Sequence, residues 1–334
     1  MNEPRLDTTR LQHFARAYTR SAALFAAIDL KLFTHINRGV FETADLAATL
    51  GISELNVERL VTVCLAMDLV RRENDRLLNA PDVNRYLVKG KKTYAAAWMT
   101  FTRPGVPQWL ELTELLRNQE PAARLGIDFD MTVDEARRYH EATYSVGMGA
   151  GRLFCRQVDL SGRRKMLDLG GGSGAYCINA AKAFDGLEAI VFDLPAVTEV
   201  AREHIAENGI SDRVGTIAGD FTSDPFPRGC DVVLMASNLP MYNEETIGLV
   251  VRKAFEALEP GGEMHLVGEM LDADGVGPLD AALWGLQEVL RNSEGKAHTV
   301  GQVRGYFTAA GFETVEDRDF VPGVLRRVWG RKPV

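Results

Sequence analysis

The chain lacks several features that mark membrane, secreted or fibrous proteins. None of its apolar runs approaches the roughly 18–20 residues that a membrane-spanning helix needs. The first residues, MNEPRLDTTR, are charged and lack the apolar segment of a secretory signal. Gly (31) and Pro (13) are too few among 334 residues for a collagen-like or low-complexity chain. These absences favour a globular protein of the cytoplasm with no membrane partner.

Metal-binding patterns and excess positive charge are also missing. The four cysteines form no CxxC pair, so neither a zinc ribbon nor a disulfide framework is expected. The six histidines show no ligand spacing, and we expect no metal site. Acidic side chains outnumber basic ones by 46 to 38, giving a net charge of −8. That balance argues against a protein whose main task is to bind nucleic acid.

The length and the pattern along the chain predict two domains. A chain of 334 residues exceeds the size at which a single core stops growing. Residues 1–160 have mainly helical spacing, with further helices expected at 10–33, 93–117 and 131–158 and an exposed connection at 117–126. From residue 161 to 334, short apolar runs alternate with helical segments at 175–184, 197–208, 244–257 and 299–310. This alternation predicts an α/β domain with a doubly wound, mostly parallel sheet.

Residues 43–78 have the pattern of a winged helix. Thr43 is expected to cap a short helix that ends at Gly51, Ser53 opens a second helix at 54–68, and 69–78 form a small hairpin. The second helix exposes mostly acidic side chains, the wrong sign for a helix that enters the DNA major groove. We therefore expect a packing or dimerisation module.

A glycine-rich segment marks the candidate ligand site. LDLGGGSGAY, residues 167–176, ends a predicted strand and opens a helix. Gly170, Gly172 and Gly174 allow a tight turn and close approach of a ligand to the backbone. The same letters satisfy the dinucleotide-binding pattern at Gly170, Gly172 and Ala175, so a nicotinamide-dependent oxidoreductase is an alternative.

Acidic residues stand at three successive strand ends. Asp168 precedes the glycine turn, where a carboxylate would repel a pyrophosphate but suits an ammonium or sulfonium group. Asp193, in VFDLP, is placed to accept hydrogen bonds from ribose hydroxyls, and Asp220–Phe221, in AGDF, offers an acceptor and a ring to an adenine. Sheets of this kind bind ligands at their carboxyl edge.

These motifs resemble class I S-adenosylmethionine-dependent methyltransferases. More narrowly, LDLGGGSG, FDLP, GDF, DVVLMAS and EALEPGGEMHLVGE are similar to the small-molecule O-methyltransferase family of the caffeate and acetylserotonin type. The resemblance covers nearly the whole chain and implies a winged-helix dimerisation domain, a homodimer, and S-adenosylmethionine as cofactor. The cofactor contacts it implies are Asp168, Gly170, Gly172, Gly174, Asp193, Leu194, Asp220, Phe221 and Ser237.

The chain departs from this family where the family commonly carries its catalytic His. That position holds Pro240, followed by Met241 and Tyr242, and a family lysine is replaced by Ala236. Of two family glutamates that orient the His, one matches Glu269 and the other falls at Ala297. Proline and alanine cannot take a proton. The candidates for catalysis are therefore Tyr144, Tyr242, His298 and Glu269.

The missing base leaves three explanations open. The acceptor can be one that gives up no proton before attack, such as a thioether sulfur (as in methylthiohydroxybutyrate S-methyltransferases) or a carbon. Alternatively, the protein is an O-methyltransferase whose base has moved to Tyr144, Tyr242 or His298. In the third explanation, the protein has lost methyl transfer and is a winged-helix protein that senses its ligand. The acceptor is expected to lie against Trp98, Arg103, Met148, Asn238, Met241, Trp284 and Arg291.

Overall fold

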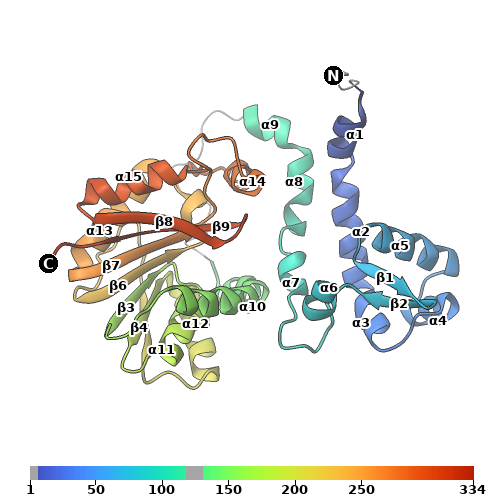
Figure 1. Cartoon of the computed structure of the whole chain (residues 1–334), viewed down its shortest axis with the longest axis horizontal. Helices are drawn as coiled ribbons and strands as arrows, with labels where there is room; N and C mark the ends of the chain where they lie inside the picture. The colour runs from blue at the N-terminus through green and yellow to red at the C-terminus, as the bar shows by residue number, and fades with distance from the viewer. Residues whose placement is uncertain (1–6, 118–130) are drawn as a thin grey trace. The chain divides into compact units, whose positions relative to one another are not determined.

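The computed structural model describes residues 7–117 and 131–334 and divides the chain into two compact units, Met1–Thr102 and Arg103–Val334 (Figure 1). Each unit is described by itself. The predicted connection at 117–126 lies, beyond Arg117, outside the described residues. The predicted boundary at residue 160 stays a prediction, although the long helix that precedes it belongs by its contacts to the second unit.

The first unit begins with three helices, α1 (Thr9–Ala15), α2 (Ala17–Asp29) and α3 (Leu32–Asn37). The single helix expected at 10–33 is interrupted, because Arg16 and Lys31 leave helical geometry and Lys31 adopts a positive φ of 56°. Two short helices close the unit, α6 (Pro81–Tyr86) and α7 (Ala96–Met99).

A helix–turn–helix with a hairpin follows α3, in agreement with the winged-helix pattern. Helix α4 (Thr43–Leu50) ends at Gly51, which has the left-handed φ of 69° that favours glycine, and α5 (Glu54–Ala66) is capped by the Ser53 side chain. Strands β1 (Val70–Glu73) and β2 (Arg76–Asn79) pair antiparallel. The prediction that Thr43 caps α4 is wrong, because Glu42 occupies the cap position and Thr43 is already helical.

The second unit contains a seven-stranded mixed sheet in the order β5-β4-β3-β6-β7-β9-β8. The five parallel strands are β3 (Lys165–Leu169), β4 (Glu188–Asp193), β5 (Val214–Ala218), β6 (Cys230–Ala236) and β7 (Leu258–Gly268). Strands β8 (Glu313–Val321) and β9 (Leu325–Arg331) close the sheet antiparallel. The predicted doubly wound, mostly parallel sheet is confirmed, whereas β8 was missed.

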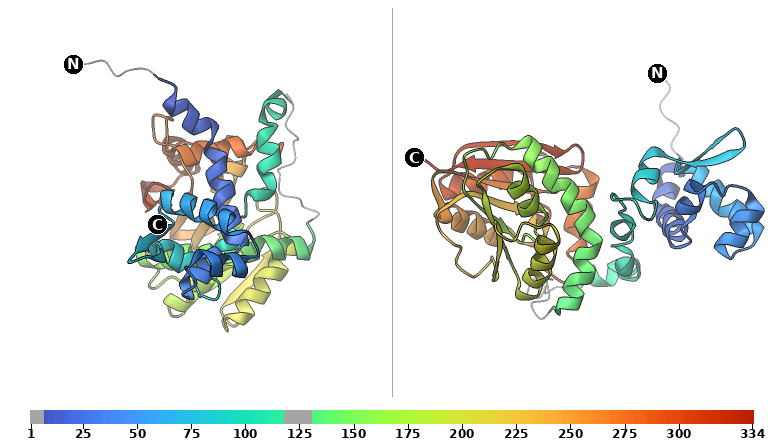
Figure 2. Two further views of the ribbon diagram at one scale, coloured as in Figure 1. Left: turned by 90° about the vertical axis from the view of Figure 1, so that its right-hand side faces the viewer. Right: turned by 90° about the horizontal axis from the view of Figure 1, so that it is seen from below.

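Alternate residues of the strands face two helical layers, as the period of two in a strand requires. Leu167 and Leu169 pack with α13 (Glu244–Ala257) and α15 (Val300–Ala310). Met166 packs on the other face with α10 (Val133–Gln157), α11 (Ala175–Ala183) and α12 (Pro195–Glu207). Figure 2 shows α10, in green, as one long helix along the flank of this unit.

Short helices complete the second unit. They are η1 (Arg103–Gly105), α8 (Val106–Leu110), α9 (Leu112–Arg117), η2 (Leu239–Met241) and α14 (Leu279–Gln287). The helical stretch at 93–117 is broken into pieces around Pro104, where Pro104, Gly105 and Pro107 predict an interruption. Within residues 7–117 and 131–334, no helix is both long and apolar enough to cross a membrane.

Candidate cofactor and acceptor site

The glycine turn after β3 is built so that side chains cannot replace its glycines. Gly170, Gly172 and Gly174 all have positive φ, at 63°, 56° and 75°. A Cβ on Gly170 would stand 2.5 Å from Asn238 Nδ2, and a Cβ on Gly172 would stand 2.8 Å from His140 Cε1. The turn is therefore packed between Asn238 and His140, and side chains at Gly170 or Gly172 would disrupt it.

Asp193, at the end of β4, is tied to the glycine turn. Its Oδ2 accepts a hydrogen bond from the Gly172 N–H (2.8 Å) and its Oδ1 accepts one from the Leu194 N–H (2.7 Å). Burial raises the pKa of Asp193 to about 6, against the opposite effect of these two hydrogen bonds. The carboxylate thus has a fixed orientation beside the turn, and its contact with ribose hydroxyls stays a prediction.

Asp168, one residue before the end of β3, is buried without a compensating cation. Its side chain is 1% exposed, and its Oδ1 has no hydrogen-bond partner. Burial and then the charge of Asp193 raise the pKa of Asp168 to about 8. A buried acid in this state is stabilised by a cationic ligand group, which restores its charge.

Two further polar groups, Tyr176 and Glu269, belong to the same electrostatic environment as Asp168. The Tyr176 hydroxyl, at the start of α11, is buried without a partner, and the carboxylates of Asp168 and Glu269 both act on it electrostatically. Burial raises the pKa of Glu269, which directly follows β7. Asp168 Oδ1 and the Tyr176 hydroxyl are thus two buried polar atoms without a hydrogen-bond partner, and the charge of Glu269 acts on the second of them.

At the third strand end, the carboxylate of Asp220 is already hydrogen-bonded within the chain, whereas the sequence predicts that it offers an acceptor to an adenine. Both oxygens of Asp220 are used locally: Oδ1 accepts from the Thr222 N–H and hydroxyl, and Oδ2 accepts from the Ser223 hydroxyl. Phe221 is buried and its ring meets Tyr242 edge-on, with 5.2 Å between ring centroids. The adenine contact assigned to this pair stays a prediction.

The loop after β6 supports the glycine turn. Asn238 Nδ2 donates to the carbonyl oxygens of Leu169 and Gly170, each at 3.3 Å. Ser237 is exposed and has a positive φ of 61°. Asn238, predicted to bind the acceptor, thus holds the cofactor turn in this structure.

Pro240, Met241 and Tyr242 follow in a short turn that packs closely on a later segment. Pro240 and Tyr242 are buried, whereas Met241 is partly exposed. The Pro240 carbonyl oxygen lies only 2.4 Å from where a Cβ on Gly295 would stand. Burial raises the pKa of the Tyr242 hydroxyl far above its usual range, so this phenol stays neutral near pH 7.

Both ring nitrogens of His298 are occupied. Nε2 lies 2.9 Å from the carbonyl oxygen of Tyr242, and Nδ1 lies 3.0 Å from the hydroxyl of Tyr306. The ring is fully buried, and burial lowers its pKa. His298 thus links the segment before α15 to the Tyr242 turn.

Tyr144 does not lie at the carboxyl edge of the sheet. Its hydroxyl accepts a hydrogen bond from Asn208 Nδ2 (2.7 Å), and its ring stacks on His204 at 4.1 Å between centroids. Asn208 caps the C-terminus of α12, which starts at the carboxyl edge and is about 20 Å long for its 13 residues. Tyr144 therefore lies toward the opposite end of α12.

The remaining acceptor candidates belong to several elements and to both units. Met148 faces α11, where its Sδ lies 3.3 Å from Asn179 Nδ2. Trp98 belongs to the first unit and stacks on Phe101, while Arg103 is the first residue of the second unit. Trp284 is half-buried on α14.

Arg291, predicted to bind an anionic acceptor, is paired within the chain. Its Nη1 donates to Glu288 Oε1 at 2.6 Å, and the other oxygen of Glu288 accepts from the Ser293 hydroxyl at 2.7 Å. Glu288 is 1% exposed, and burial raises its pKa. The sequence pattern gave no reason to single out Glu288.

His140, on α10, is the other residue that the sequence patterns missed. Its ring contacts Gly172 and meets Tyr139 edge-on, with centroids 5.1 Å apart. The one signal was a histidine in a helix, which is not specific. No cluster of three or more His, Cys, Asp or Glu side chains able to hold a metal occurs among the residues that the structure describes.

The site suits a cofactor with a cationic group. It combines an orphaned buried carboxylate oxygen on Asp168 with a glycine turn that any Cβ would fill. A pyrophosphate would meet two acids at this place, the buried Asp168 and the partly buried Asp193. The geometry therefore favours a sulfonium nucleoside over a dinucleotide.

Comparisons with known proteins identify the family. A model of the O-methyltransferase domain matches residues 116–313, and a model of the O-methyltransferase dimerisation domain matches residues 12–90. The chain is 31% identical over 329 residues to the 3-hydroxy-5-methyl-1-naphthoate 3-O-methyltransferase of Streptomyces sahachiroi, covering 97% of this chain and 95% of that protein.

Two further similar proteins match different shares of the chain. The L-tyrosine C(3)-methyltransferase of Streptomyces lavendulae is 36% identical over 177 residues, about half of each chain (52% and 48%). The crystal structure of human N-acetylserotonin methyltransferase shares the fold, with a TM-score of 0.83 and 23% identity over 100% of both chains. The chain belongs to the S-adenosylmethionine-dependent O-methyltransferase family that carries an N-terminal dimerisation domain.

Proposed function

We propose that this methyltransferase acts on a hydroxyl group of a small aromatic molecule. The observation that carries the proposal is the 31% identity to a naphthoate O-methyltransferase along nearly the full length of both chains. The O-methyltransferase reading therefore has more support than the thioether acceptor that the missing His first favoured.

S-adenosylmethionine is the cofactor of this enzyme, and it supplies a methyl group already activated by the sulfonium. Similar folds have been solved in complex with S-adenosylmethionine and, for PigF, S-adenosylhomocysteine. In this chain Asp168 and Asp193 would hold the cationic and ribose portions, and the turn from Gly170 to Gly174 would lie along the cofactor. The chain's main contribution is to position the acceptor in line with the methyl group.

The proton of the acceptor hydroxyl needs a place to go, and Pro240 at the usual His position offers none. Tyr242 is neutral, His298 uses both nitrogens, and Tyr144 binds Asn208. Glu269 remains: it stands at the end of β7, and burial raises its pKa, which makes its carboxylate a stronger base. We assign the role of proton acceptor to Glu269.

Methylation of a ring carbon is the second candidate function. It rests on the 36% identity to an L-tyrosine C(3)-methyltransferase, which covers about half of each chain. A phenol attacks through its ring carbon and loses the carbon-bound proton afterwards, so a modest base such as Glu269 serves both reactions.

The dimerisation-domain match supports a homodimer, which we propose together with a cytoplasmic location. Exposed apolar side chains occur on the first two helices, at Leu11, Phe14 and Tyr18, where such a contact would bury them. Light scattering on the purified chain should give twice the mass of 36.8 kDa.

An acceptor screen tests the proposed reaction. The protein is incubated with S-adenosylmethionine carrying a ¹³C methyl group and with hydroxynaphthoates, tyrosine or a carboxylated thioether. An aromatic O–¹³CH₃ product identified by NMR supports the proposal. An aryl C–¹³CH₃ product replaces it by ring methylation, and a permanently cationic sulfonium product overturns both.

A further inference from the structure

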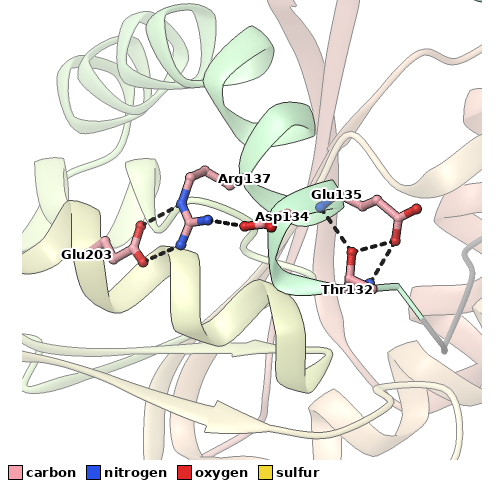
Figure 3. Close-up of polar contacts among 5 residues, drawn as sticks. All are labelled: Thr132, Asp134, Glu135, Arg137 and Glu203. Carbon is pink, nitrogen blue, oxygen red and sulfur yellow. Dashed lines mark hydrogen bonds and ion pairs between the residues drawn. The ribbon is translucent and has the colours of Figure 1, made fainter.

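His140 faces inward from a helix whose position is fixed at its start. A capping box joins Thr132 and Glu135, and Arg137 binds Glu203 of α12 through two hydrogen bonds of 3.2 and 2.7 Å, as well as Asp134 (Figure 3). These contacts fix the first turns of α10 against α12. His140 follows Arg137 by three residues and lies about one turn beyond these contacts.

The inward stripe of α10 is small or apolar at most positions; Tyr144, one turn after His140, is polar but has its hydroxyl bonded to Asn208. Ala136, one turn earlier, is buried against Leu194 and Val197, and a Cβ on Gly151 would come within 2.8 Å of the Ala175 carbonyl oxygen. Residues four apart lie on the same helix face. A histidine in this stripe therefore departs from the packing that surrounds it.

The imidazole of His140 is buried but not hydrogen-bonded to the described part of the chain. The residue is 7% exposed, its ring edge lies over Gly172, and its neighbours are the edge of Tyr139 and, through charge, His204. Burial, followed by the charge of His204, lowers the pKa of His140 to about 4. A neutral imidazole carries one donor and one acceptor nitrogen, so this ring is able to bind either kind of polar ligand atom.

We propose that His140 is a cofactor-binding residue, whose imidazole hydrogen-bonds S-adenosylmethionine where the cofactor lies along Gly172. The partner on the cofactor would be an oxygen, either of the amino-acid carboxylate or of the ribose, since both can accept a hydrogen bond from an imidazole N–H. The proposal rests on the cofactor and not on the identity of the acceptor, so it stands or falls separately from the proposed reaction.

Calorimetric titration of three proteins tests this contact: the wild type, His140→Phe and His140→Asn. Phenylalanine keeps a ring over Gly172 but has no nitrogen, whereas asparagine keeps a donor and an acceptor. We expect His140→Phe to weaken S-adenosylhomocysteine by about 10–100-fold, as loss of a hydrogen bond to a charged group does, and His140→Asn to weaken it less. His204→Phe, a substitution of the histidine that stacks on Tyr144, is the matched control and should bind normally.

A second ligand identifies the partner atom. 5′-Methylthioadenosine has the ribose but lacks the amino-acid tail. If His140→Phe weakens only S-adenosylhomocysteine, the contact is with the carboxylate; if both ligands weaken equally, it is with the ribose. Binding of both ligands within twofold of wild type overturns the proposal.

Histidine NMR provides a readout that does not depend on activity or on the stability of a variant. The six histidine ring signals of the ¹⁵N-labelled wild type are followed as S-adenosylhomocysteine is added. The signal absent from His140→Asn should shift on saturation. A His140 signal that stays in place while the ligand binds contradicts the contact.

Discussion

The Nε2 atom of His298 lies 2.9 Å from the carbonyl oxygen of Tyr242, and this contact joins the segment before α15 to the turn that carries Pro240. Because the same ring also meets the Tyr306 hydroxyl, the imidazole has no nitrogen left for an acceptor. His298, a candidate base by its position in the sequence, thus has a structural role in the folded chain.

Substitution of His298 should therefore affect stability more than catalysis. His298→Ala leaves the buried Tyr242 carbonyl without its partner, at a cost of about 1–3 kcal/mol in the free energy of unfolding. We expect kcat at a permissive temperature to fall less than tenfold and the pH profile to keep its shape. Denaturant unfolding and a pH–rate series measure both; a loss of a hundredfold or more in kcat without destabilisation would restore His298 as a base.

For Glu269 we expect the opposite, namely that substitution affects catalysis more than stability. Glu269→Gln keeps the shape of the side chain but removes the proton acceptor, so kcat should fall by about 10²–10⁴-fold while the Kd of S-adenosylhomocysteine changes little. Raising the pH should partly restore the rate, since a hydroxyl acceptor then ionises by itself. Glu263→Gln, in the same strand but remote in register from the strand end, is the comparison variant. Full activity of Glu269→Gln would rule out this role.

The glycine turn should tolerate no side chain at Gly172. Alanine there combines a φ of 56° with a contact of 2.8 Å to the His140 ring. We expect Gly172→Ala to weaken S-adenosylhomocysteine at least about tenfold, because the backbone must shift to admit the methyl group. Gly209→Ala has a similar φ of 65° but open space around its Cβ, so it reports the strain alone and should bind normally.

Asp168 should make the stability of the ligand-free enzyme fall as the pH rises. Burial raises its pKa to about 8, whereas the unfolded chain ionises near 3.8. Between these values the folded state holds a proton that the unfolded state has lost, so unfolding becomes easier with increasing pH. Melting temperatures at pH 5.5 and 8 should differ accordingly, and Asp168→Asn should reduce the difference. S-adenosylmethionine should raise the melting temperature more at pH 8, where its cationic group faces an ionised partner. An equal slope in Asp168→Asn would contradict this account.

The Glu288–Arg291 pair should behave as a unit. Arg291→Met leaves the nearly inaccessible carboxylate of Glu288 without its cation, which in buried pairs costs about 3–5 kcal/mol. The double variant Glu288→Gln/Arg291→Met removes both charges and should recover much of the loss. Chemical denaturation of the four proteins of this cycle gives the coupling. If the loss of stability in the double variant equals the sum of the losses in Glu288→Gln and Arg291→Met, the pair is not coupled.

Local sequence patterns were sufficient for the architecture and for the glycine turn after β3. Alternating strands and helices predict the parallel sheet, and LDLGGGSG with Asp168 and Asp193 predicts which end of it binds a ligand. These signals survive because they depend on residues adjacent in the chain: strand period, positive φ at glycine, and a carboxylate at a strand end. The break in the helix expected at 10–33 and the missing β8 show their limit, since tertiary contacts override local spacing.

The use of each polar side chain was decided only by the tertiary structure. Tyr144 binds Asn208, 64 residues away, and Asn238 donates to the Gly170 carbonyl, 68 residues away. His140 reaches Gly172 because α10 is anchored on α12, which no local pattern encodes. Hydrogen-bond partners and burial depend on which distant segments meet, so the sequence by itself determined the fold and the ligand edge, while packing determined which groups remain free to act there.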